Sequence, residues 1–200
     1  AKPFSVESGE AFAISGNFTG GEDAVVFSGA VSVKAGTIDN AKVEGTLTVA
    51  GDAKITTITV NGAVSIDAGK TLTTETATVF GTIAGAAKDA SGNEGKLKVD
   101  VMYIGIAAKD IIVSTGATAS VTGNVTLGDY ALVAPGTTVP EAFTKEGSDY
   151  KTTVFYIGDK LYLTAYAANE NTTGYIASVD AHIENARFDG WYNEDGDKAV

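Results

Sequence analysis

Apolar and polar residues alternate with a period of two in short runs along the first 140 residues. Clear examples are Val31/Val33, Leu47/Val49 and Val64/Ile66. This period places one set of side chains on one face of a β-strand, and the β-branched residues that dominate the runs favour pleated, half-buried strands. Because no window of about twelve residues shows a 3.6-residue period with helix caps, the pattern predicts an all-β fold.

A short unit of the form polar-Gly-x-apolar-x-apolar recurs through the same region, mostly every 16 to 19 residues. Its glycines are Gly16, Gly29, Gly45, Gly62, Gly81, Gly105 and Gly123. A strand rises about 3.3 Å per residue, so a unit of this length is too long for one strand. It predicts two or three short strands joined by sharp corners, where glycine supplies positive φ. This is one coil of a single-stranded β-solenoid, or β-helix.

The polar, glycine-rich run 87–96 interrupts the spacing and is predicted to be a loop inserted into one coil. An antiparallel β-sandwich with glycine-rich turns is the alternative, since turn signals also recur at shorter intervals. The near-constant unit favours a solenoid of about 17–19 residues per coil over residues 1–140. Its rhythm resembles that of the bactofilins, a family of polymer-forming solenoids.

The composition changes near residues 140–150, where Pro135 and Pro140 precede a polar run. We therefore predict a linker at 141–149 and a small β-rich module at 150–200. Runs 151–158 and 159–167 read as two strands, with Gly158-Asp159 as a hairpin turn. Aromatic residues become frequent here and indicate a small aromatic core. They are Tyr150, Phe155, Tyr156, Tyr162, Tyr166, Tyr175, Phe188, Trp191 and Tyr192.

The segment Phe188-Asp189-Gly190-Trp191-Tyr192 resembles the F-x-G-W-Y signature of the internalin-type B repeat. That family is a β-grasp-like module of large bacterial and archaeal surface proteins. The resemblance implies that Phe188, Trp191 and Tyr192 belong to the motif that builds the module core, and that Gly190 permits a close approach. It also implies a role in adhesion or spacing at a cell surface. A further strand normally follows the motif, so the module would be incomplete at Val200.

Charge and composition exclude several classes of function. The net charge of −11 provides no basic footprint for nucleic acid and would be repelled by an anionic membrane surface. The chain has no cysteine, and no apolar stretch approaches the length of a transmembrane helix. We expect no membrane span in this segment. The absence of cysteine fits several compartments, so the expected extracellular or cell-surface location rests mainly on the resemblance of the C-terminal module.

Few residues suggest chemistry. Three N-x-[ST] sequons, at Asn17, Asn124 and Asn171, are candidate N-glycosylation sites. The acidic turn 193–197 only loosely resembles a calcium loop, so an exposed turn is favoured and calcium binding stays open. The single histidine, His182, cannot form a histidine-based metal site. Acids such as Asp39 and Glu75 are scattered rather than paired as glycoside chemistry requires. We expect no catalytic, metal or cofactor-binding residue and no cofactor.

These features predict a non-enzymatic structural or adhesin-type surface protein in which the solenoid is a rigid spacer. Exposed strand edges at the ends of a solenoid can template further strands. A self-assembling subunit of an extracellular filament, sheath or surface layer is therefore an alternative, and a carbohydrate-active β-helix enzyme is a second. Expected partners are further copies of the chain, neighbouring surface-protein modules, or a glycan or host-surface ligand.

Overall fold

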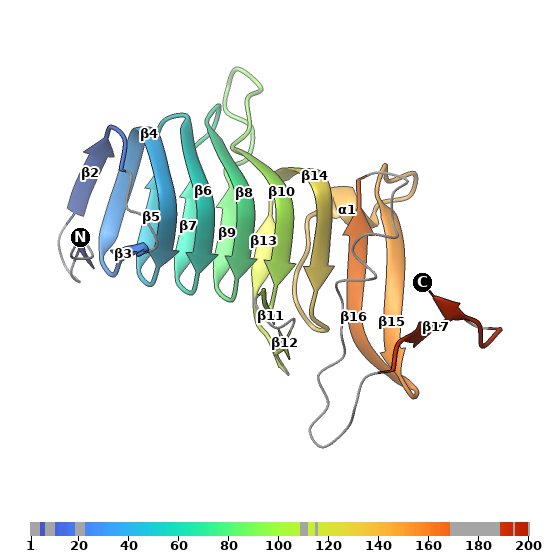
Figure 1. The fold of residues 1–200 in the computed structure, drawn as a ribbon. Helices are drawn as coiled ribbons and strands as arrows, with labels where there is room; N and C mark the ends of the chain where they lie inside the picture. Colours follow the sequence, from blue (N-terminus) through green and yellow to red (C-terminus); the bar gives the residue numbers. More distant parts are fainter. Residues whose placement is uncertain are drawn as a thin grey trace.

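The structure, a computed structural model, describes residues 5–6, 11–18, 23–108, 112–114, 116–168, 189–193 and 195–199. Nearly all of their regular secondary structure is β-strand, which confirms the predicted all-β class (Figure 1). The strands are β1 (Ser5–Val6), β2 (Ala11–Ser15), β3 (Val25–Phe27), β4 (Ala30–Val43), β5 (Thr46–Val49), β6 (Ala53–Val60), β7 (Ala63–Ile66), β8 (Thr71–Val79), β9 (Thr82–Gly85), β10 (Lys96–Ile104), β11 (Ile106–Ala107), β12 (Ile112–Val113), β13 (Ser120–Thr122), β14 (Asn124–Val133), β15 (Lys151–Ile157), β16 (Lys160–Ala167), β17 (Trp191–Tyr192) and β18 (Lys198–Ala199). The described residues contain one helix, α1 (Glu141–Thr144).

Fourteen strands form one large sheet that is mostly parallel. It has two strips that share β4. The long strip runs β3-β4-β6-β8-β10-β14, and the short strip runs β2-β4-β5-β7-β9-β13. Every pairing within either strip is parallel, so the antiparallel sandwich is wrong for this region. Figure 1 shows the strands of both strips stacked side by side along one direction.

The pairing register reproduces the predicted repeat over its first part. In the short strip Val31 pairs with Leu47, Leu47 with Val64, and Val64 with Ile83. The steps of 16, 17 and 19 residues match the spacing of Gly29, Gly45, Gly62 and Gly81. The next step is longer, since Ile83 pairs with Val121. Residues 86–95 contain no strand, so the predicted insertion is confirmed almost residue for residue.

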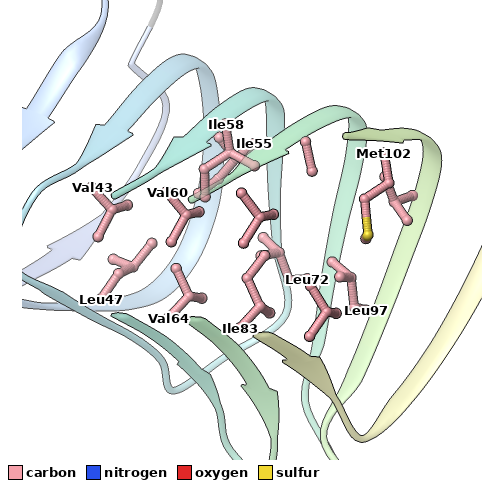
Figure 2. Packing of buried hydrophobic residues seen from close by; sticks show 14 of the residues in the cluster. Val43, Leu47, Ile55, Ile58, Val60, Val64, Leu72, Ile83, Leu97 and Met102 are labelled. Atoms are coloured by element: carbon pink, nitrogen blue, oxygen red, sulfur yellow. The ribbon is translucent and has the colours of Figure 1, made fainter. Parts of the chain in front are cut away.

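A continuous apolar interior lies between the two strips. Val43, Val60, Val79 and Ile104 occupy matching positions of the long strip, and each is fully buried. In the short strip Leu47 and Val64 face Val43 and Val60 across this interior, and Ile83 continues the same row (Figure 2). Each of these side chains therefore packs against a similar side chain of the next strand, which keeps the interior closely packed along the sheet.

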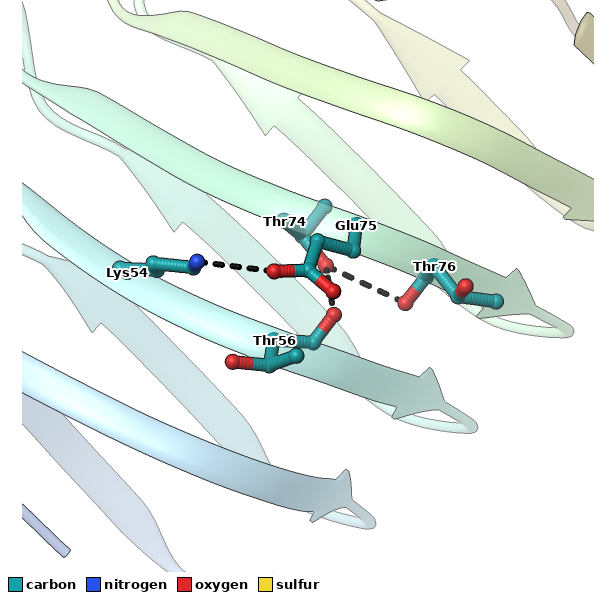
Figure 3. A network of polar contacts seen from close by, with 5 residues as sticks. All are labelled: Lys54, Thr56, Thr74, Glu75 and Thr76. Atoms are coloured by element: carbon teal, nitrogen blue, oxygen red, sulfur yellow. Dashed lines mark hydrogen bonds and ion pairs between the residues drawn. The ribbon is translucent and has the colours of Figure 1, made fainter. Parts of the chain in front are cut away.

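The strands of the long strip bend midway. In β6 the buried positions are Ala53, Ile55, Ile58 and Val60, so the alternation slips by one residue at Thr56–Thr57. A slip of this kind turns the chain while keeping apolar side chains on the inside. The buried Thr74 of β8 lies at the equivalent bend. Its hydroxyl is 3.2 Å from the Thr56 carbonyl oxygen and 3.1 Å from that of Thr76, so its proton has an acceptor (Figure 3).

The repeat glycines act by a different means from the one predicted. Gly45, Gly62 and Gly81 have no positive φ, so the expected left-handed corner is wrong for these three. A Cβ on Gly62 would instead lie 2.0 Å from the carbonyl oxygen of Gly45, and one on Gly81 would lie 1.9 Å from that of Gly62. Glycine is required here because successive backbones stack in direct contact. Gly16, Gly105 and Gly123 do have positive φ.

The last two repeat units depart from the pattern. After Gly105 the chain leaves the sheet and forms the small antiparallel pair β11–β12. The run beginning at Asn124 pairs with β10 in the long strip, where Val125 lies opposite Leu97, and not with the short strip. The side-chain pattern of this run matches the repeat, but its neighbours place it on another side of the molecule.

The C-terminal part of the sheet is antiparallel. The predicted hairpin is confirmed, because β15 and β16 pair across a turn at Gly158-Asp159. β16 also pairs with β14, so the hairpin continues the large sheet. The segment 141–149, predicted as a linker, contains α1, and its Phe143 is 1% exposed within the main core. The division of the chain into two domains at 141–149 stays a prediction. The structure shows that this segment contributes Phe143 to the main core.

Candidate functional site

The acidic side chains of the described residues are dispersed over the surface. Within the described ranges, no group of three or more His, Asp or Glu side chains could hold a metal ion. The carboxylates instead form isolated surface contacts. Glu75 pairs with Lys54 at 2.8 Å (Figure 3), and Glu44 pairs with Lys42 at 2.6 Å. The Lys42 contact, followed by the Asn61 amide, lowers the pKa of Glu44. His182 lies outside the described residues.

Two of the three sequon asparagines are described, and both are exposed. The Oδ1 atom of Asn17 accepts a hydrogen bond from the backbone N–H of Thr37 at 3.1 Å. The Nδ2 atom of Asn124, which a glycan would modify, donates to Glu94 at 2.8 Å. This bond is the main reason that the pKa of Glu94 is lowered. Asn171 lies outside the described residues. Of the two described sequon asparagines, Asn17 is the one whose Nδ2 atom makes no hydrogen bond to another described residue.

The F-x-G-W-Y segment packs against the hairpin. The Trp191 ring lies 4.8 Å from that of Phe155 and 5.9 Å from that of Tyr162, measured between centroids. A Cβ on Gly190 would lie 2.5 Å from Cε of Lys198, which is near the end of a flexible side chain, so the close-approach role of Gly190 stays a prediction. Tyr192 is 52% exposed. Phe188 lies outside the described residues.

Tyr192 and the acidic turn make local hydrogen bonds. The Tyr192 hydroxyl donates to Asp189 at 2.7 Å, and this contact raises the pKa of Tyr192. The turn 193–197 joins β17 to β18, and its Asn193 Oδ1 accepts from the N–H groups of Asp195 and Asp197. That oxygen is thus already used within the turn.

The first part of β14 is covered by an end cap, defined here as α1 with Tyr150 and Tyr166. The Phe143 ring lies 4.9 Å from Tyr150 and 5.3 Å from Tyr166. β16 pairs only with residues 130–133 of β14, so the earlier part of β14 needs another partner. The Tyr150 hydroxyl accepts a hydrogen bond from the Leu127 N–H at 3.1 Å. The end cap therefore covers an edge that a further strand could otherwise occupy.

A cleft of about 470 Å³, here called the end cleft, lies between the β11–β12 pair, the turn after β14 and the tip of the β15–β16 hairpin. Its lining is Val113, Ser114, Gly116, Pro135, Ile157, Lys160, Leu161 and Tyr162. Beneath it lies a second apolar cluster that includes the fully buried Ile106, Leu132 and Leu163. The lining is mainly apolar, with Lys160 as its charged group among the described residues.

A second, more open groove of about 780 Å³ lies between the 86–95 loop and α1. Glu94, Asn124, Glu141 and Lys145 contribute to its polar lining. The loop is ordered by Asp89, whose Oδ1 accepts from the N–H groups of Ser91 and Asn93. The Asn93 bond is the largest cause of the lowered pKa of Asp89. This groove follows from the insertion and contains the sequon Asn124.

Sequence reasoning missed both the end cap and the end cleft. Phe143 is a lone large apolar side chain in a polar segment, which is a signal for a buried anchor. The end cleft has no comparable local signal, because its walls come from three segments that are distant in sequence.

Comparisons with known proteins add no relative: no protein-family model, curated protein or solved structure matches the chain. Among the described residues, none forms a helix with the length and hydropathy needed to cross a bilayer. The strand arrangement and the surface features are therefore the basis for the class of protein.

Proposed function

We propose that this chain is a non-enzymatic, extracellular structural protein in which residues 1–140 form a single-stranded β-solenoid that acts as a rigid spacer. The observation that carries the proposal is the shared register of the two parallel strips. Each successive strand repeats the same inward-facing positions at steps of 16, 17 and 19 residues, as in Leu47, Val64 and Ile83. A chain that winds in this way buries each coil against the next.

Rigidity follows from this packing. Bending the rod would separate stacked side chains such as Val60 and Val79, which are both fully buried. It would also break parallel hydrogen bonds on two strips at once. The close backbone contacts at Gly62 and Gly81 leave no room for one coil to slide over the next. These properties suit a spacer that holds neighbouring modules apart.

The surface assignment rests on the resemblance of Gly190-Trp191-Tyr192 and its neighbours to the internalin-type B repeat. The polymer-forming alternative has less support. A filament that grows by strand addition needs an open edge at each end. The end cap covers the edge of β14 near Leu127, which counts against strand addition at β14 but not at β15, whose one partner among the described strands is β16. No observation among the described residues favours the carbohydrate-active enzyme.

Cell-surface labelling tests the location. Antibodies raised against the purified chain should bind intact, unpermeabilised cells that produce the protein, and brief protease treatment of those cells should remove the signal. An antibody to a cytosolic protein is the control and should bind only after permeabilisation. If the antibody to this chain also requires permeabilisation, the surface assignment is wrong.

Negative-stain microscopy and light scattering of the purified chain separate spacer from polymer. A spacer should remain monomeric as its concentration is raised. Regular filaments or sheets would replace the spacer proposal with the self-assembling subunit.

A further inference from the structure

The end cleft lies where the chain leaves the regular stack. β10 and β14 are parallel, so the segments that follow them emerge at the same edge of the sheet. The tip of the β15–β16 hairpin projects past that edge, because Thr164 already lies opposite Val133. In repeat proteins, insertions that gather on one face commonly form the binding surface. The cleft volume of about 470 Å³ falls within the range of small-molecule sites.

The walls of the end cleft are fixed by the protein itself. The Ser114 N–H donates to the Gly105 carbonyl at 2.9 Å, which holds the β11–β12 pair against the sheet. On the opposite wall, the Thr137 hydroxyl donates to the Ala134 carbonyl at 2.8 Å and orders the turn that contains Pro135. The apolar cluster that includes Leu132 and Leu163 supports both walls. A site ordered in advance loses little conformational entropy when a ligand binds.

The chemistry of the lining selects the ligand. Val113, Pro135, Ile157 and Leu161 offer hydrocarbon surface, which favours an apolar body over a strongly hydrated one. Lys160 places an ammonium group at the hairpin tip. It takes part in none of the ion pairs between described residues, and the described lining contains no carboxylate. An anionic group on the ligand would therefore meet a cation without displacing an existing partner.

We propose that the end cleft binds a small organic acid, that is, a carboxylate attached to an aromatic or aliphatic body. The body lies against Val113, Ile157 and Leu161, and the carboxylate pairs with Lys160. The Ser114 hydroxyl is a further donor for the ligand. This binding site is independent of the spacer role, and it would give the end of the rod a ligand of its own.

Titration of the full chain with three probes tests the site. The ¹⁵N-labelled protein is titrated with 3-phenylpropionate, with its uncharged amide, and with acetate. Saturable shifts should appear at the amides of Ser114, Gly116 and Leu161 with 3-phenylpropionate. The uncharged amide should bind about threefold to fivefold more weakly, as expected for one exposed ion pair. Acetate, which lacks the apolar body, should not saturate in the same range.

Single substitutions test which residues of the end cleft bind the ligand. Lys160→Gln should reduce the affinity for 3-phenylpropionate to that for the amide. Ile157→Asn should weaken both aromatic probes together. Lys98→Gln is the matched control, since it removes an exposed lysine from β10, and it should leave both affinities unchanged. Circular dichroism confirms that each variant is folded.

Three results would overturn the proposal. The first is no saturable shift with either aromatic probe. The second is shifts spread over the whole surface instead of the cleft. The third is an affinity for 3-phenylpropionate that Lys160→Gln leaves unchanged.

Discussion

At the scale of single residues, stacked glycines control how closely successive repeats approach. Gly45, Gly62 and Gly81 touch the backbone of the preceding repeat, so the space for a side chain is occupied by a carbonyl oxygen. The spacing predicted where glycines are needed, but the predicted reason, a positive φ, is wrong for these three. A regular spacing reveals that glycine is needed, yet it does not distinguish positive φ from close contact, because both exclude a Cβ.

Substitution of Gly62 by alanine tests this reason. The added Cβ would lie 2.0 Å from the Gly45 carbonyl oxygen, so the two backbone segments must separate. We expect a loss of about 3 kcal/mol or more in the free energy of unfolding, measured by urea denaturation. Gly92→Ala is the control, because Gly92 has a φ of 81° but no atom near its Cβ position. It should cost only about 1–2 kcal/mol. Equal losses would refute the close-contact explanation.

A tyrosine pair predicts how stability depends on alkaline pH. Burial, and then the hydrogen bond with Tyr130 at 3.2 Å, raise the pKa of Tyr103 above its ordinary value of 10.0. Above about pH 10 the Tyr103 hydroxyl therefore stays protonated in the folded state, whereas it ionises in the unfolded chain. The stabilising contribution is complete below about pH 10 and is lost as the pH rises towards the folded pKa.

Urea denaturation between pH 8 and about pH 11 measures this effect. Tyr103→Phe should make the decline in the free energy of unfolding above about pH 10 less steep. Tyr156→Phe changes a ring that is 56% exposed and serves as the control. A decline that is the same in Tyr103→Phe and in the unmodified chain would contradict the assignment.

At the scale of elements, α1 has a larger role than its four residues suggest. Its Phe143 is 1% exposed and lies between Tyr150 and Tyr166, which belong to segments on either side of β15. The helix therefore joins the hairpin to the end of the stack. The strands and the hairpin could be predicted from local alternation and turn residues. The cap could not, because its stability depends on contacts made after the chain has folded.

Removal of the Phe143 ring tests the end cap. Phe143→Ala should lower the free energy of unfolding by about 3–5 kcal/mol, because a buried aromatic side chain is lost. It should also uncover the edge of β14, so that light scattering detects concentration-dependent association while the variant is still folded. Lys145→Ala changes an exposed neighbour and should do neither. A variant that is destabilised but stays monomeric would show that the cap only stabilises the fold.

At the scale of the whole molecule, the strand order β4-β6-β8-β10-β14-β16-β15 is one uninterrupted sheet. The repeat in the sequence predicts its first part well, since alternation and glycine spacing are local signals. The later part was harder to predict. The run at Asn124 has the repeat pattern but lies in the long strip, and the pair β11–β12 lies outside the large sheet and helps form the end cleft. Which strands become neighbours depends on where the chain leaves the large sheet, and a local pattern of residues does not determine this.

Distances between spin labels test the central claim, a rigid stack of evenly spaced strands, most directly. The chain has no cysteine, so pairs of cysteines introduced at exposed or half-buried positions are labelled specifically. Thr37→Cys with Thr126→Cys spans four strand steps, or about 19 Å, and Lys42→Cys with Thr152→Cys spans six steps, or about 29 Å. Pulsed electron paramagnetic resonance should give one narrow distance for each pair, with the second longer by about 10 Å. Broad distributions, or two pairs of equal separation, would contradict the rigid stack.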